Sequence, residues 1–251
     1  MIVGIFIPIY FRENLVKKCL ESLLKSDFGG IDVFLCLGIN GATSEFKEYL
    51  KRYVTYVNGR IFKHVHVFDD NKNLGKPKMV NLMAEKYNTF DYLVSMDSDI
   101  VTIDDKWLKK FLYAFDLYRG DYQLSGICAA QEGNDCNFVQ TLKDCQTYEI
   151  NKEMHLMYNT KCEGVAGAVL ITKREIWNMF EGYGAKNIYG DDDSSYAQKS
   201  HYFRKLLPMF CEVKVYHPSE NNIEYSKWKL KAAHGKLEEK ESSGFFENLR
   251  K

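Results

Sequence analysis

Two carboxylates stand one residue apart at the end of an apolar run in the middle of the chain. The run at residues 92–96 leads directly into Asp97-Ser98-Asp99. Apolar runs bounded by polar residues are typical of buried strands, so we expect both carboxylates where a core strand leaves its sheet. Ligands bind at that end of the strands in open α/β sheets. Two carboxylates there can hold a hard divalent cation, which in turn can hold phosphate oxygens.

Three more polar groups fall at expected loop positions. Residues 69–78 contain Asn73-Leu74-Gly75-Lys76, where a glycine lets backbone approach a ligand and lysine can neutralise phosphate. A solvated loop before a helix would explain the same residues. Asp191-Asp192-Asp193 opens an expected helix; three adjacent like charges exceed what capping needs, and their mutual pKa increase suits a general base. His217 follows the last expected strand and could be a further ligand of an ion such as Mn²⁺.

Alternating strands and helices must position these groups. In the first half, strands are expected at residues 2–8, 31–37, 62–68 and 90–96, and helices after residue 14, at 44–57 and at 78–87. Pro8 is expected to end the first strand, and residues 38–41 to form the turn after the second. This order with short connections predicts a parallel sheet with right-handed crossovers.

The pattern changes after Asp99. Helices are expected at residues 107–118, 173–180 and 191–197, and strands at 123–130, 164–171 and 211–216. Residues 131–162 show little periodicity. From residue 219 the chain is charged, which predicts a partly helical C-terminal extension over residues 219–251.

The composition narrows the cellular setting. The 251 residues carry no net charge, which excludes a global electrostatic attraction to nucleic acid or to anionic membranes. The seven cysteines form no C-x-x-C pair, as expected of reduced thiols. The first strand begins at Ile2, and no apolar run reaches the length that spans a bilayer. We therefore expect a soluble cytoplasmic protein without a transmembrane segment.

Taken together, these motifs resemble a known family. Pro8-x-Tyr10, then N-L-G-K at residues 73–76 and L-V-S-M-D-S-D at residues 93–99, is similar to the nucleotide-sugar glycosyltransferases of the GT-A fold, closest to family 2. The small-residue segment 164–173 followed by Tyr-Gly-Asp-Asp-Asp at residues 189–193 is also similar to β-1,4-galactosyltransferases. The resemblance implies an α/β, Rossmann-like fold with a mixed, mostly parallel central sheet and helices on both faces. It further implies one catalytic domain over residues 1–218, with a nucleotide-sugar half (1–101) and an acceptor half (102–218).

The resemblance also implies residue roles. Asp99, Asp97 and His217 would hold the divalent metal, Mn²⁺ or Mg²⁺. Asp192 would be the catalytic base, with its neighbour Asp191 as the alternative. The implied donor-binding residues are Pro8, Tyr10, Glu13, Asn40, Asp70, Asn73, Lys76 and Asp97. Asn40 stands where the family usually has two acidic residues, so its amide would hydrogen-bond the base or ribose.

The activity implied is inverting transfer of a sugar from a nucleotide-sugar, with a UDP-sugar favoured, to a glycan or polysaccharide precursor. Transfer to a hydroxylated base in viral DNA is an alternative, because Lys227, Lys229, Lys231 and Lys236 surround Trp228 near the C-terminus. A sugar nucleotidyltransferase is a further class, although residues 10–14 lack the glycines its phosphate loop would need. A non-catalytic sugar-binding module is the third.

Overall fold

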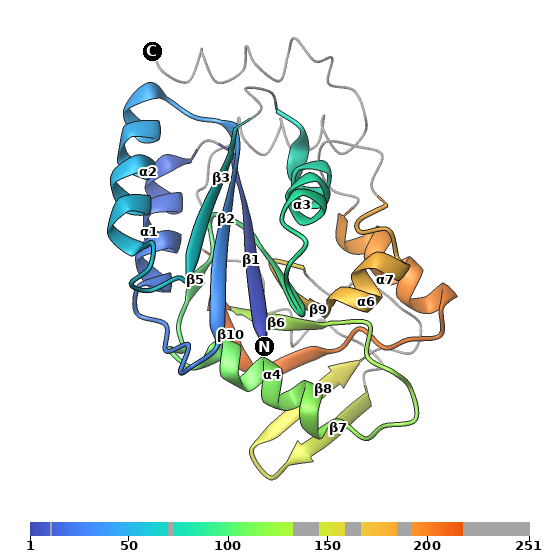
Figure 1. Cartoon of the computed structure of the whole chain (residues 1–251). Coiled ribbons are helices and arrows are strands. Elements are labelled where there is room, and N and C mark those ends of the chain that lie inside the picture. Colours follow the sequence, from blue (N-terminus) through green and yellow to red (C-terminus); the bar gives the residue numbers. More distant parts are fainter. Residues whose placement is uncertain (11, 70–72, 133–145, 159–166, 185–191, 218–251) are drawn as a thin grey trace.

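Ten strands form one central sheet in the part of the chain that the structure describes (Figure 1). The computed structural model describes residues 1–10, 12–69, 73–132, 146–158, 167–184 and 192–217. The strand order is β3-β2-β1-β4-β9-β6-β10-β8-β7, and the short β5 pairs with β10. The strands are β1 (Ile2–Tyr10), β2 (Asp32–Gly41), β3 (His64–Asp69), β4 (Tyr92–Met96), β5 (Val101–Thr102), β6 (Ile127–Glu132), β7 (Gln146–Asn151), β8 (Met154–Tyr158), β9 (Val169–Lys173) and β10 (Met209–Tyr216).

The first half of the sheet is parallel, as the alternating pattern predicts. Strands β3, β2, β1 and β4 pair in parallel, and they are connected by α1 (Glu13–Leu23), α2 (Ser44–Val57) and α3 (Gly75–Lys86). The carboxyl ends of these strands therefore lie at one edge of the sheet. Strand β9 then enters antiparallel between β4 and β6. The residues just before β9 consequently reach the same edge, where the Asp97 N–H donates to the Ala168 carbonyl at 2.8 Å.

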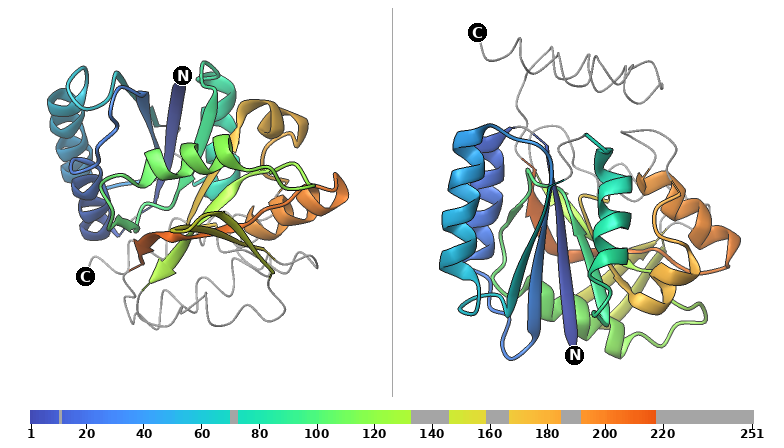
Figure 2. Two further views of the ribbon diagram at one scale, coloured as in Figure 1. Left: turned by 90° about the horizontal axis from the view of Figure 1, so that it is seen from below. Right: turned by 45° about the horizontal axis from the view of Figure 1, so that its top comes forward.

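Helices cover both faces of the sheet, as predicted (Figure 2). Alternate residues of β1 divide between two cores. Ile5 and Ile7 face the core shared with α1, α2 and α4 (Trp107–Leu117). Phe6 faces the core shared with α3, α6 (Arg174–Met179) and α7 (Asp192–Tyr202). Burial on both faces explains why β1 is apolar without alternation.

Two local expectations, in β1 and β2, are wrong, and one hairpin was not expected. Strand β1 continues past Pro8 to Tyr10, and residues 38–41 belong to β2 instead of a turn. Gly38 is there for close packing, since a Cβ at this position would lie 2.5 Å from Cγ of Met79 in α3. The weakly periodic segment 131–162 contains the β7–β8 hairpin, whose strands are only partly buried and so lack a clear apolar pattern.

Among the described residues, the buried Cys19, Cys36 and Cys128 are free thiols. No helix in this part of the chain is long and apolar enough to cross a membrane. The expected C-terminal extension at residues 219–251 lies outside the described residues.

Candidate active site

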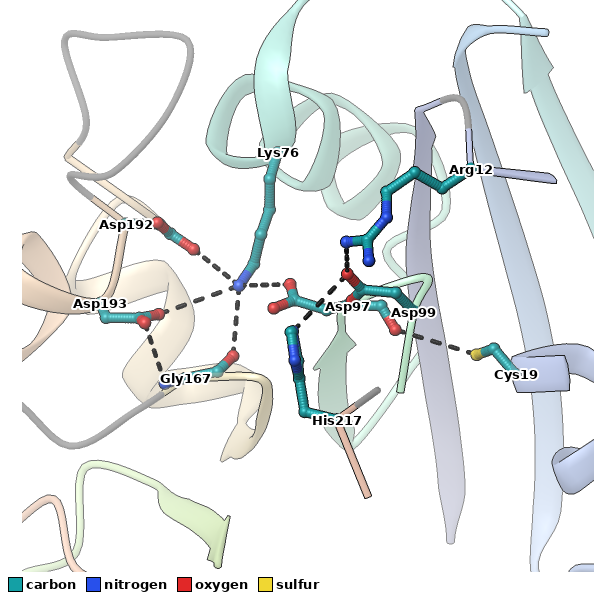
Figure 3. A network of polar contacts seen from close by, with 9 residues as sticks. All are labelled: Arg12, Cys19, Lys76, Asp97, Asp99, Gly167, Asp192, Asp193 and His217. Atoms are coloured by element: carbon teal, nitrogen blue, oxygen red, sulfur yellow. Dashed lines mark hydrogen bonds and ion pairs between the residues drawn. The ribbon is translucent and has the colours of Figure 1, made fainter. Parts of the chain in front are cut away.

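Lys76 is the centre of a polar network at the carboxyl end of β4 (Figure 3). Its Nζ lies 2.7 Å from Oδ1 of Asp97 and 2.6 Å from Oδ2 of Asp192. Oδ1 of Asp193 is 3.8 Å away, and the Gly167 carbonyl accepts a hydrogen bond from Nζ at 3.2 Å. Burial alone would lower the pKa of Lys76, but the three carboxylates raise it well above its usual range. The lysine is thus a permanent positive charge that joins two halves of the sequence.

Two asparagines set the position of Lys76. The Asn40 side-chain oxygen accepts from the Leu74 N–H at 3.0 Å, and that of Asn73 accepts from the Gly75 N–H at 3.0 Å. Gly75 begins α3 with a φ of 72°, a conformation that favours glycine. Asn40 is buried in β2, and its side-chain oxygen holds the N-L-G-K segment. The glycine and both asparagines therefore place the lysine at the edge of the sheet.

Asp192 and Asp193 begin α7 on the other side of Lys76. Oδ2 of Asp193 accepts a hydrogen bond from the Gly167 N–H at 2.9 Å. A Cβ on residue 167 would lie 1.9 Å from Oδ1 of Asp193, so any larger residue there would displace this carboxylate. Asp193 belongs to the predicted Asp191-Asp192-Asp193 group, but the base role was given to Asp192 or Asp191. Gly167 was a further signal for Asp193, because a residue without a side chain leaves room for an approaching carboxylate.

The two adjacent carboxylates of α7 differ in acidity. Burial would raise the pKa of Asp192, but the contact with Lys76 lowers it below its usual value. Burial, together with Asp192 and Asp97, raises the pKa of Asp193 to about 7 against the opposing effect of Lys76. The Asp193 side chain is 38% exposed, compared with 12% for Asp192. Asp193 is therefore both the better proton acceptor at neutral pH and the more accessible one.

Asp99 has cationic or basic partners of its own. Arg12 Nη1 lies 2.5 Å from Oδ2 of Asp99, and His217 Nε2 lies 3.5 Å from the same oxygen. Arg12 precedes α1 in the loop after β1, and His217 follows β10. The structure thus brings together His217 and Asp99, which are 118 residues apart in sequence (217 − 99). Arg12 was not predicted; a basic residue in the loop after the first strand was its only signal.

The predicted metal ligands converge in part. A carboxylate oxygen and an imidazole nitrogen suit ions such as Mn²⁺. Ligands about 2.1 Å from one ion at right angles lie about 3 Å apart, close to the Asp99–His217 spacing. Asp97 points to Lys76 instead, and burial raises its pKa. No group of three or more His, Cys, Asp or Glu in the described ranges is arranged to hold a metal. Asp99 and His217 lie close enough together that they could hold a divalent cation, which would supply positive charge for phosphate oxygens.

Comparison with known proteins identifies the chain's family. Residues 4–179 match the model of glycosyl transferase family 2. The chain belongs to this family. A search of curated protein sequences found no significant match to the chain.

Solved structures with the same fold include glycosyltransferases. Mannosyltransferase PcManGT from Pyrobaculum calidifontis, in complex with GDP-Man and Mn²⁺, superposes with a TM-score of 0.68 at 14% identity over 93% of this chain and 63% of that chain. S. aureus TarS gives 0.65 at 14% identity, over 98% and 42%. GalNAc-T7 with UDP, GalNAc and Mn²⁺ gives 0.66 at 13% identity, over 88% and 44%. The family 2 chain thus spans about two fifths to three fifths of these proteins, and their likeness confirms the predicted GT-A fold.

The remaining predicted residues of this family 2 chain lie around the network or outside the described residues. Pro8 is buried in β1, and Tyr10 ends that strand. Glu13 begins α1, where its Oε1 accepts hydrogen bonds from Thr43 N–H at 3.0 Å and Oγ1 at 2.6 Å. Since Thr43 caps α2, Glu13 connects two helix starts at the same edge of the sheet. Asp70, Asp191 and the lysines at 227–236 lie outside the described residues.

Proposed function

We propose that this family 2 chain is a metal-dependent glycosyltransferase that moves a sugar from a nucleotide-sugar to an acceptor hydroxyl with inversion. One observation carries the proposal. Asp97, which follows β4, and the two carboxylates that begin α7 meet at one lysine, Lys76, at the sheet edge where α/β proteins bind ligands. The known structures with this fold that contain GDP-Man or UDP together with Mn²⁺ support it.

The first half, together with His217 from the end of the second half, would hold the donor. Asp99 and His217 would bind Mn²⁺ or Mg²⁺, and such a cation stabilises the negative charge of a departing diphosphate. Lys76 adds a permanent positive charge a short distance away, beside Asp97. Pro8, Tyr10 and Glu13 lie at or near the end of β1, where the nucleoside of a UDP-sugar would be bound. Asn40 and Asn73 would contribute by fixing the backbone from which Lys76 projects.

The second half would supply the base. An acceptor hydroxyl becomes a better nucleophile when a nearby group removes its proton, and the most effective base has a pKa close to the working pH. Asp192, the base expected from the sequence, is held in an ion pair with Lys76 that makes it a weak base. Asp193 is more exposed and has a pKa of about 7. We therefore assign proton removal to Asp193 and the positioning of Lys76 to Asp192.

The acceptor is proposed to be a glycan or polysaccharide precursor. The lysine-rich segment that suggested DNA lies outside the described residues. Direct attack of the hydroxyl, assisted by one carboxylate base, would invert the configuration at the sugar carbon.

Donor recognition can be tested by thermal unfolding. The parent protein and Asp99→Ala are heated with Mn²⁺ and with UDP-, GDP- and CDP-sugars in turn. One nucleotide class should raise the parent midpoint by about 5–10 °C at a hundredfold excess over Kd, and should not raise that of Asp99→Ala. If no donor shifts the parent, or if the variant shifts equally, the proposed donor site is wrong.

The reaction class can then be read from the products. With the donor that binds, a glycosyltransferase slowly releases nucleoside diphosphate without acceptor and only with the metal. A nucleotidyltransferase would instead exchange pyrophosphate, and a binding module would release nothing.

A further inference from the structure

Arg12 holds an unusual place between the first strand and the predicted metal ligand. It precedes α1 with φ 52° and ψ 42°, a left-handed conformation that is rare outside glycine. Because β1 and β4 are neighbours in the sheet, its guanidinium reaches Asp99 across the strand ends (Figure 3). Both side chains are nearly buried, with 11% and 14% exposed. Backbone strain held in a buried charged contact is more often found at functional sites than elsewhere.

The Arg12 guanidinium and a divalent cation held by Asp99 and His217 would compete for the same carboxylate. Arg12 Nη1 lies 2.5 Å from the same Oδ2 that faces His217 Nε2. A divalent cation bound between Asp99 and His217 would lie within a few ångströms of the guanidinium, and like charges that close repel strongly at a partly buried site. Metal binding would therefore weaken the ion pair between Asp99 and Arg12, and Arg12 would lower the affinity for the metal.

The chemistry of arginine indicates which group would replace Asp99 as the partner of Arg12. A guanidinium presents several N–H donors in a planar fork that matches phosphate oxygens. A diphosphate bound through the cation at Asp99 would bring such oxygens beside Arg12. The diphosphate would thus replace the carboxylate as the arginine's partner, in the same small space.

We propose that Arg12 is an exchangeable counter-ion of the donor site. It pairs with Asp99 when the metal is absent and donates to the donor diphosphate when metal and nucleotide are bound. The inference rests on the proposed function, since it takes Asp99 as a metal ligand. This exchange would make the binding of metal and nucleotide cooperative, because Arg12 opposes metal binding until the nucleotide diphosphate becomes its partner.

The test measures two affinities that this role moves in opposite directions. Calorimetric titration of MnCl₂ alone should show that Arg12→Gln binds Mn²⁺ about tenfold more tightly than the parent, since a repelling charge is gone. Titration of UDP and of GDP at saturating Mn²⁺ should show about tenfold weaker binding of the preferred nucleotide, since a charge-assisted hydrogen bond is lost. Arg174→Gln is the matched control. Its guanidinium donates to the Asn88 carbonyl at the opposite end of β4, and both affinities should stay unchanged.

Two further variants separate the possible failures. Arg12→Lys keeps the charge and loses the fork, so Mn²⁺ affinity should stay unchanged while nucleotide binding weakens; this result stands even if Arg12→Gln fails to fold. Unchanged Mn²⁺ affinity in a folded Arg12→Gln, or unchanged nucleotide affinity in either Arg12 variant, overturns the proposal. Asp99→Asn tests the proposed function separately. If it binds Mn²⁺ as tightly as the parent, the metal site is elsewhere whatever Arg12 does.

Discussion

Two pairs of carboxylates form the site, and they differ in how their charges are balanced. Asp97 and Asp99 leave a buried strand one residue apart and turn to different partners: Lys76 for the first, Arg12 and His217 for the second. Asp192 and Asp193 begin a helix and turn to the same lysine, at 2.6 and 3.8 Å. The two carboxylates of the strand pair therefore contact different partners, whereas the two of the helix pair contact the same lysine and differ in pKa. Residues of one type can thus be suited to separate tasks by their surroundings alone.

Lys76 explains why the two pairs act as one site. It comes from α3, contacts one carboxylate of the strand pair and both of the helix pair, and is 16% exposed. Donor binding and proton removal would consequently share a single counter-ion. Variants that lack one member of either pair, or that lack the lysine, test this arrangement.

The largest expected effect is on turnover. Asp193→Asn keeps the size of the side chain and its place beside Gly167 but cannot accept a proton. It should reduce kcat by about 10²–10⁴-fold, the usual contribution of a general base. Asp192→Asn should reduce kcat less, because Asp192 is assigned to positioning. Steady-state rates at saturating donor and acceptor measure both; a larger loss in Asp192→Asn would return the base to the residue expected from the sequence.

The next effect is on stability. Lys76→Met leaves three nearby carboxylates without their shared cation, which should lower the free energy of unfolding by about 3–5 kcal/mol at neutral pH. The loss should shrink in acid as the carboxylates become protonated. Urea unfolding at neutral and at acidic pH measures this loss of stability. Lys63→Met, which removes an exposed ion pair with Asp32 at the start of β2, is the control and should change the midpoint little. A Lys76→Met protein as stable as the parent would show that the lysine does not join the two pairs.

A smaller effect distinguishes the two helix carboxylates in the unmodified protein. The Asp193 pKa of about 7 means that a base at this residue would be ionised above pH 7 and protonated below it. Turnover should therefore fall about tenfold for each unit below pH 7 and level off above it. Lys76 lowers the pKa of Asp192, so a base at that residue would keep its activity well below pH 6. A pH profile of kcat at saturating donor, metal and acceptor decides between them.

Much of the fold could be predicted from the sequence, because parallel strands buried on both faces leave continuous apolar runs. The Asp97-Ser98-Asp99 motif marked the end of β4, and the alternation of strands and helices predicted the parallel half. The β7–β8 hairpin could not be predicted, since its partly exposed strands carry no apolar pattern. Gly38 suggested a turn because a sequence does not show that Met79 packs against it.

The site was predicted less completely than the fold. Lys76 was selected by its type in an expected loop before a helix, which the structure shows to be the first turn of α3, and His217 was selected by its type after a strand. Arg12 was missed, and Asp193 was grouped with Asp191 and Asp192 but was not chosen as the base, since the roles of both depend on β1, β4, α7 and the segment before β9 meeting at one edge. Asn40 was selected as a donor ligand, yet its side-chain oxygen holds Leu74, a contact that depends on β2 extending through residue 41.

One measurement directly tests whether the strand pair binds the donor while the helix pair supplies the base. Calorimetric titration of UDP or GDP with Mn²⁺ is carried out on the parent, Asp99→Asn and Asp193→Asn. We expect Asp99→Asn to lose more than about tenfold in affinity, because a metal ligand is gone, and Asp193→Asn to bind as the parent does. Equal losses in both variants, or a loss in Asp193→Asn alone, would contradict the separation of donor binding at β4 from base catalysis at α7.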